Sequence, residues 1–156
     1  MAENAHLYLK INGTAVAGDS TSLSDGSIEL QSVSWGVHAP IDWQLGSYTG
    51  RREYSAVSAS KRIDKASPLM FKALTTNQIV EGTIKFFRPT AAGDAVSENF
   101  YTLDFKAGRI ESISQGAGGS DIQTETIAFA FRSFTMTYDT KGAKGITNQD
   151  DWQKKT

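Results

Sequence analysis

Residues 124–138 read TETIAFAFRSFTMTY, and this stretch decides the fold class. Ile127, Phe129 and Phe131 share one face at alternate positions, which is typical of a half-buried β-strand. The alternation resumes from Phe134 with the opposite parity. Because a slip of one residue moves every side chain to the other face of a sheet, we predict a bulge or sharp bend near Arg132-Ser133.

The same alternation is found elsewhere in the chain. Leu7, Leu9 and Ile11 alternate with polar neighbours near the start, and the residues from Tyr101 to Phe105 do so in the second half. Turn-rich pieces such as Lys106-Ala107-Gly108 separate further strands, which are predicted at residues 27–35, 53–59, 79–88 and 109–114. Six or seven strands indicate a mainly β fold, either a sandwich or a barrel.

One helix is predicted from Ser67-Pro68 to about Asn77. Serine is a favoured N-cap, and proline is favoured at the first helical position because its missing donor would be unpaired there. An apolar face follows at helical spacing, made of Leu69, Met70, Ala73 and Leu74. One such helix is enough to cover the opening of a curled sheet.

The segment from Ile28 to Trp35 also changes face. The apolar positions change from Ile28 and Leu30 to Val33 and Trp35, which have the other parity. After this change, Ser32 and Ser34 occupy the parity opposite to Val33 and Trp35. Long strands with a polar second face suit a sheet that lies between a core and either solvent or a wide aqueous channel.

The irregular stretch at residues 36–50 is too apolar for an idle solvent loop. It contains His38, Pro40, Trp43, Leu45 and Tyr48. It either folds back on its own domain or docks on a partner. Further along, residues 140–156 are predicted to form a polar C-terminal tail after a domain that spans residues 1–139.

Composition excludes several kinds of site. The chain has no cysteine, which rules out disulfides, thiolate nucleophiles and cysteine-ligated metals. A net charge of -1 gives no bulk attraction to nucleic acid or to a membrane. The N-terminus lacks the pattern of a cleaved signal peptide, and no apolar run approaches the ~20 residues that span a bilayer. We expect a protein that is cytoplasmic at first and leaves the cell, if it does, without a cleaved leader.

Charge is unevenly distributed along the chain. Residues 1–50 carry five acidic side chains and one basic one, whereas residues 51–72 carry six basic and two acidic ones. This pattern indicates either a solvated basic edge or one half of a complementary pair of surfaces for self-association.

No catalytic, cofactor or metal site is predicted. Residues 116–120 are glycine-rich but lack the Lys-Ser/Thr of a phosphate-binding loop. His6 and His38 are far apart in the sequence, and we expect ordinary packing or surface roles for both. A hydrolase would require a carboxylate site assembled only by the fold. We therefore expect a protein that is not an enzyme.

Several segments occur in an order shared with one known family and together span nearly the whole chain. They are Ser24–Leu30 leading to Ser34-Trp35-Gly36, Ile63–Leu69, Gly118-Gly119-Ser120, Thr124–Phe129, Thr135–Tyr138 and Asp150-Asp151-Trp152. Together they resemble the haemolysin-coregulated protein (Hcp) family of type VI secretion. The Asp-Lys-x-Ser-Pro helix entry, combined with the final strand and tail, makes the resemblance strong.

The resemblance implies a small barrel of two β-sheets with one flanking α-helix and an extended loop. It also implies a homo-hexameric ring, and rings that stack into a tube inside a contractile sheath. A VgrG-type spike tips this tube, which a bacterium ejects with effector proteins in its lumen. The family's simple form has no catalytic activity and no cofactor. With about 18 residues after Tyr138, we expect none of the toxin extensions that some members carry.

The resemblance also implies roles for individual residues. Ser34 matches the family's lumen serine and Ser32 shares its parity, so we expect both on the lumen wall in contact with effectors. Residues 36–50 match the extended loop, which reaches toward adjacent subunits and rings. The residues expected at a subunit or ring interface are Trp43, Leu45, Tyr48 and Asp64.

Two alternatives remain open at this point. The first is a monomeric β-barrel that carries a small apolar ligand, in which Leu103, Phe129 and Phe131 line a cavity. The second is a phage tail tube protein, which shares the physics of the type VI tube; the sequence alone separates the two only through the family motifs.

Overall fold

Thirteen strands and one helix make up the described part of the chain. The structure is a computed structural model that describes residues 4–20, 25–89, 97–118, 123–139 and 145–151. In chain order the elements are β1 (Asn4–Ile11), β2 (Thr14–Val16), β3 (Ile28–Ser34), β4 (Val37–His38), β5 (Ile41–Asp42), β6 (Ser47–Tyr48), β7 (Glu53–Tyr54), β8 (Val57–Arg62), α1 (Ser67–Thr75), β9 (Val80–Pro89), β10 (Ser97–Gly116), β11 (Thr124–Ala130), β12 (Ser133–Tyr138) and β13 (Ile146–Asp151).

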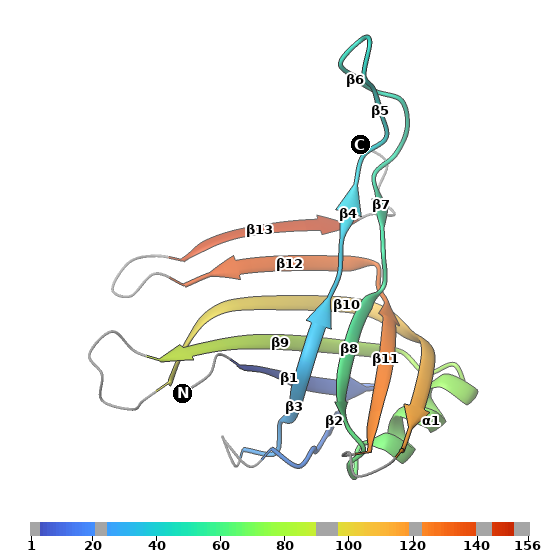
Figure 1. Cartoon of the computed structure of the whole chain (residues 1–156), viewed down its shortest axis with the longest axis vertical. Coiled ribbons are helices and arrows are strands. Elements are labelled where there is room, and N and C mark those ends of the chain that lie inside the picture. The colour runs from blue at the N-terminus through green and yellow to red at the C-terminus, as the bar shows by residue number, and fades with distance from the viewer. Residues whose placement is uncertain (1–3, 21–24, 90–96, 119–122, 140–144, 152–156) are drawn as a thin grey trace.

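One nine-stranded antiparallel sheet forms the body. Its order is β11-β8-β3-β1-β9-β10-β12-β13, and β2 pairs with β1. The long strand β10 pairs with β12 through its first half and with β11 through its second half, so the sheet curls over itself (Figure 1). The mainly β fold with one flanking helix and an extended loop is confirmed. Hydrogen bonding makes one continuous sheet where two were expected.

The hydrophobic core fills the inside of the curl. Leu7, Ile84 and Phe129 are almost completely buried there, on three different strands. The rings of Phe105 and Phe129 lie with centroids 5.1 Å apart. Phe105 passes over Gly82 of β9, where an added Cβ would lie 2.5 Å from the ring, so this close crossing requires glycine.

The predicted turn at Lys106-Ala107-Gly108 is wrong, because strand β10 continues through these residues without a break. The pairing with β9 jumps from Phe105 opposite Gly82 to Gly108 opposite Val80, which leaves one extra residue in β10. Ala107 adopts a φ of 52°. A bulge with a left-handed residue therefore produces the sequence pattern that a turn would also produce.

Both predicted changes of face are confirmed. The chain bends between β11 and β12, so Phe131 and Phe134 are both buried despite their opposite parity. β3 shifts its register against β8 between Leu30 and Ser32, which is a β-bulge or similar irregularity.

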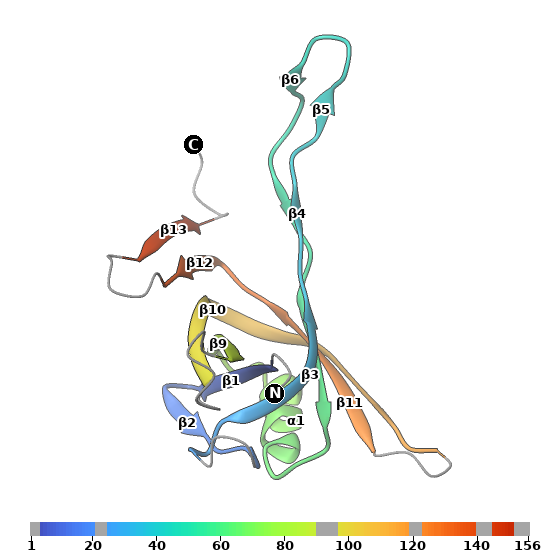
Figure 2. The same ribbon diagram turned by 60° about the vertical axis from the view of Figure 1, so that its left-hand side comes forward.

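The helix lies at the end of the body away from the extended loop (Figures 1 and 2). Its N-cap is Ala66 and not Ser67, because the Ser67 hydroxyl turns inward and makes buried contacts. Met70 and Ala73 are buried as predicted, but Leu69 is exposed on the flank. Among the described residues, no helix has the length and apolar character needed to cross a membrane.

Part of the segment predicted as a polar tail is ordered in the sheet. Residues 146–151 form β13, which pairs with β12 at the end of the strand order. Trp152 lies outside the described residues, as do residues 119 and 120 of the glycine-rich stretch.

Candidate functional site

Ser32 and Ser34 lie in β3 on the side of the sheet that faces away from the core. Both side chains are exposed, whereas Leu30 of the same strand is buried. The register shift after Leu30 produces this change. Across the β3–β8 ladder the two serines stand opposite Ser60 and Ser58.

The polar pattern continues over the next two strands. Thr126 of β11 lies opposite Ser60 on one side and opposite Ser114 of β10 on the other, and the small Ala128 takes the next position that faces the same way. Directly opposed residues on antiparallel strands share a face of the sheet. We call this surface the hydroxyl face; its residues are Ser32, Ser34, Ser58, Ser60, Ser112, Ser114 and Thr126.

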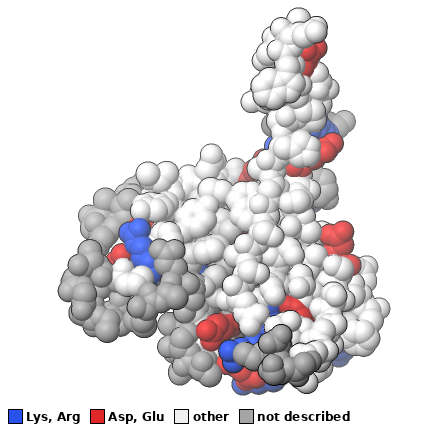
Figure 3. Space-filling view, viewed as in Figure 1, with Lys and Arg blue, Asp and Glu red and all other residues white. Residues whose placement is uncertain are grey.

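The hydroxyl face contains small side chains and no formal charge. In the view of Figure 1, β3 and β8 lie toward the viewer, and the surface over them in Figure 3 is almost free of acidic and basic residues. Hydroxyl groups both donate and accept hydrogen bonds. Such a surface can hold a polar partner without selecting it by charge.

Residues 36–55 form a two-stranded arm that projects from the body (Figures 1 and 2). Its ladders join β4 to β7 and β5 to β6. The side chains near the tip are highly exposed, at 90% for Trp43, 78% for Leu45 and 75% for Tyr48. The alternative in which this segment folds back on its own domain is therefore wrong, and the tip presents an apolar surface to solvent.

The shape of the tip is fixed by the chain itself. The Asp42 carbonyl accepts a hydrogen bond from the Gly46 N–H at 2.7 Å. The Asp42 carboxylate accepts from the backbone N–H groups of Gln44 and Leu45, at 2.9 and 3.3 Å. Gly46 has a φ of 67°, a left-handed conformation that glycine adopts without strain. The tip is therefore preorganised before any partner arrives.

Aromatic side chains anchor the base of the arm. Tyr54 packs edge-on against Phe131, with centroids 5.2 Å apart. Trp35, at the start of the arm, packs on Phe134 at 4.5 Å. Both strands of the arm are therefore fixed to the bend between β11 and β12.

An ionic contact ties the same base to the C-terminal strand. Arg52 donates from Nε and Nη2 to the two carboxylate oxygens of Asp150, at 2.5 and 2.6 Å. The Tyr54 hydroxyl donates to Asp150 Oδ2 at 2.6 Å. The hydrogen bonds from Arg52 hold the pKa of Asp150 below its usual range, and burial together with the Asp150 contact raises the pKa of Tyr54 to about 12.

A buried ion pair links β8 to β11 beneath the helix start. Lys61 and Glu125 are direct cross-strand partners, each side chain is 1% exposed, and Lys61 Nζ lies 2.5 Å from Glu125 Oε1. Ser67 donates to the same oxygen at 2.6 Å, and Gln115 donates to Oε2 at 2.8 Å. Burial favours a raised pKa for Glu125, but these hydrogen bonds and the lysine outweigh it and lower the pKa.

Asp64 belongs to the same network. It accepts from Lys61 Nζ at 2.8 Å and from the Ala66 N–H at 3.0 Å, and its side chain is mostly buried. Its expected place at an interface stays a prediction. The basic segment at residues 51–72 forms no single surface, because Lys61 is buried and Arg52 lies at the base of the arm.

The two histidines have the roles expected of them. His6 is fully buried, with Nδ1 3.1 Å from the Ser27 hydroxyl, and burial lowers its pKa. His38 lies on the exposed arm, 3.1 Å from Glu53. No group of three or more metal-ligating side chains exists within the described part of the chain.

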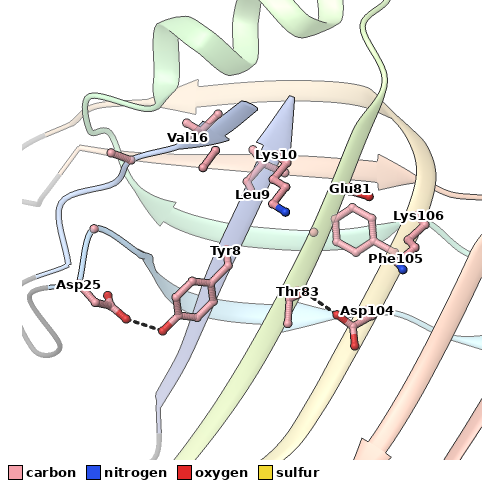
Figure 4. A pocket seen from close by; sticks show the side chains of 14 residues that line it. Tyr8, Leu9, Lys10, Val16, Asp25, Glu81, Thr83, Asp104, Phe105 and Lys106 are labelled. Carbon is pink, nitrogen blue, oxygen red and sulfur yellow. Dashed lines mark hydrogen bonds between the residues drawn. The ribbon is translucent and has the colours of Figure 1, made fainter. Parts of the chain in front are cut away.

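A β-barrel that carries a small apolar ligand would need a cavity at a place where this structure has a packed core. Leu103, Phe129 and Phe131 are buried among other apolar side chains. A groove of about 550 Å³ instead runs over the outside of β1, β9 and β10, and its walls include charged side chains such as Lys10 and Glu81 (Figure 4). This mixed lining does not suit a small apolar ligand.

The sequence contains a signal for the buried pair of Lys61 and Glu125, which was not among the predicted site residues. Lys61 has the same parity as the buried Val57 and Ala59, and Glu125 the same parity as Ile127. A charge on an inward position predicts a buried partner. No comparable local signal exists for the contact between Arg52 and Asp150, which are 98 positions apart.

Comparison with known proteins agrees with this architecture. The family model described as "Type VI secretion system effector, Hcp" matches residues 8–138. The "Major exported protein" of Pseudomonas aeruginosa strain PAO1 is 30% identical, over 94% of this chain and 94% of its own length.

Solved structures show the same fold at lower identity. A crystal structure of an Hcp protein covers 97% of this chain and 100% of its own, with a TM-score of 0.84 and 22% identity. The secreted protein Hcp3 from Pseudomonas aeruginosa covers 98% and 100%, with a TM-score of 0.77 and 21% identity. Together with the family match, these findings establish that the chain belongs to the Hcp family of type VI secretion.

Proposed function

We propose that the protein is the tube subunit of a type VI secretion system. Six copies form a ring, and rings stack into a tube whose lumen binds effector proteins and exports them from the cell. The observation that carries the proposal is the preformed arm, whose apolar tip is left exposed by its own chain. Such a tip gains stability only when another molecule covers it.

The arm supports assembly through a contact between unlike surfaces. It projects from one end of the body, and the helix lies at the other (Figure 2). An arm of this length reaches beyond its own subunit, so its tip meets a neighbouring subunit or ring. Contacts between different patches of identical chains build closed rings and open stacks. Trp43, Leu45 and Tyr48 are the side chains that this contact buries.

The hydroxyl face supports the lumen assignment. A tube that exports proteins needs a wall that is hydrated and creates no strong electrostatic field. Seven hydroxyl side chains on four neighbouring strands would form such a wall. Ser32 and Ser34 lie in this face, beside the serines of β8. Effectors would be held there by many weak hydrogen bonds, which permit release.

Membership of the family supports the remaining partners that we propose. The ring would stack beneath a VgrG-type spike and inside a contractile sheath, and the protein would be cytoplasmic before firing and secreted afterwards without a cleaved signal peptide. The subunit would act by binding and not by catalysis, since the Hcp family is not a family of enzymes.

The lumen assignment is tested with Ser34→Gln, which places a long amide in the hydroxyl face. Rings of the variant should keep their shape in electron micrographs but capture less effector protein from a lysate of the secreting cell. Thr14→Gln, at an exposed position on β2, is the control and should capture as much as the natural protein. Undiminished capture by intact Ser34→Gln rings would contradict the lumen role.

A further inference from the structure

The C-terminal strand β13 is attached to the body mainly by polar contacts. Among the strands that the structure describes it pairs with β12 alone, and its first four residues are exposed, including Ile146 at 71%. Its two partly buried residues are Asp150 and Asp151. The strand therefore has no buried apolar side chain, and its least exposed groups are carboxylates.

Both carboxylates are held by arginines from other elements. The Asp150 carboxylate accepts a bidentate pair of hydrogen bonds from Arg52, and Arg52 Nη2 also donates to the Asp151 carbonyl at 3.1 Å. Arg132, at the bend before β12, lies 3.3 Å from the Asp151 carboxylate. A planar guanidinium that makes three such bonds fixes both distance and direction, which a lysine would not do.

Beyond the aromatic contacts of Trp35 and Tyr54 at its base, the arm needs a further fixed point. Each of its ladders contains only two residue pairs, and an isolated two-stranded ribbon is marginally stable in water. Arg52 comes directly before β7, where the return strand of the arm enters the body, and Tyr54 adds its hydroxyl to the same carboxylate. The direction of the arm and the position of β13 are therefore coupled.

We propose that β13 is the latch that positions the arm. Asp150 accepts hydrogen bonds from Arg52 and Tyr54, so the arm keeps the direction that stacking requires only while β13 is paired with β12. The proposal rests on the proposed tube function for its consequence, but the latch itself is a property of one chain. Arg52 and Asp150 are positioning residues, since the tip that meets the next copy lies elsewhere on the arm.

The test is amide hydrogen exchange on the full chain carrying Arg52→Asp. We expect the hydrogen-bonded arm amides of Thr49 and Ser55 to exchange about tenfold faster or more, because the charge reversal replaces a pair by a repulsion. Amides in α1 should be unchanged. The double variant R52D/D150R should restore slow exchange in the arm. Arg51→Asp is the matched control, with the same charge change at the exposed neighbouring position, and should leave the arm unchanged.

Electron microscopy of the same samples adds the functional result. Rings of Arg52→Asp should form, but the number of stacked rings should fall at least about fivefold and recover in the charge-swapped chain. If Arg52→Asp does not fold, Arg52→Lys keeps the charge without the two-pronged geometry and should give a smaller increase in arm exchange.

The following results would each contradict the proposal that β13 positions the arm. Unchanged arm exchange in Arg52→Asp would show that the contact does not hold the arm, and failure of R52D/D150R to restore slow exchange would show that the pair does not act directly. A loosened arm with undiminished stacking would remove the link to assembly. If the natural protein forms no rings at all, the tube function fails, while the exchange experiment still decides whether the latch exists.

Discussion

Replacing Lys61 by methionine should destabilise the fold strongly, although the new side chain is apolar and of similar length. The change removes an ammonium that touches Glu125, Asp64 and a backbone carbonyl inside the protein. Glu125 then remains buried and charged, and within the described part of the chain its remaining hydrogen bonds come from Ser67 and Gln115. Breaking a buried pair from one side costs about 3–5 kcal/mol.

The assay is urea unfolding followed by circular dichroism at a fixed protein concentration, with the double variant K61M/E125L completing a mutant cycle. Removing both charges leaves no orphaned carboxylate at position 125, although Asp64 still loses its contact with the lysine. The double variant should therefore lose less free energy of unfolding than Lys61→Met alone. The coupling between the two positions should be several kcal/mol. Additive losses would refute the argument, because they would show that the two charges do not stabilise each other.

The pH dependence has a definite sign. The pKa of Glu125 is lowered in the folded state, so its contribution to stability is complete above the unfolded value of about 4.3 and is lost as the pH falls through the folded value. In Lys61→Met the carboxylate loses a cation, so its folded pKa rises and acid neutralises the orphaned charge. The stability gap between the natural protein and the variant should therefore shrink between pH 7 and pH 4. A gap that widens on acidification would contradict the assignment.

Three further substitutions test separate parts of the structure. Trp43→Ala should change the free energy of unfolding by less than about 0.5 kcal/mol because the side chain is 90% exposed, yet reduce stacked rings in electron micrographs; a clear drop in melting temperature would contradict this. Gly82→Ala should cost about 1–3 kcal/mol in chemical denaturation, since its Cβ would meet the Phe105 ring at 2.5 Å, and an unchanged midpoint would exclude the tight crossing. Ala107→Gly should raise the free energy of unfolding by about 1 kcal/mol because it relieves a left-handed φ of 52°, whereas destabilisation would indicate that the bulge is not strained.

Local sequence patterns were sufficient to predict most of the strands and the exposed serines of β3. Alternation in β1 and β11 depends on one strand having a core face and a polar face, which is a property of neighbouring residues. The same reasoning gave the change of parity before Ser32 and the bend before Phe134. The exposed tip of the arm could be suspected from its aromatic residues, but its direction could not.

The errors have physical reasons. A bulge with a left-handed residue and a turn share the sequence Lys106-Ala107-Gly108, and only the pairing partner of β10 distinguishes them. Ser67 resembles an N-cap, but the buried Glu125 attracts its hydroxyl inward. Contacts such as Arg52 with Asp150 depend on how the chain returns after many residues, so they follow from the fold and not from spacing.

The measurement that bears most directly on the tube function is light scattering after size exclusion, with electron-microscope class averages of the same peak. Six subunits arranged around an open centre, with the hydroxyl face lining the opening, is the predicted result. A monomer of about 17 kDa that persists at high concentration and in the presence of spike and sheath proteins would contradict it.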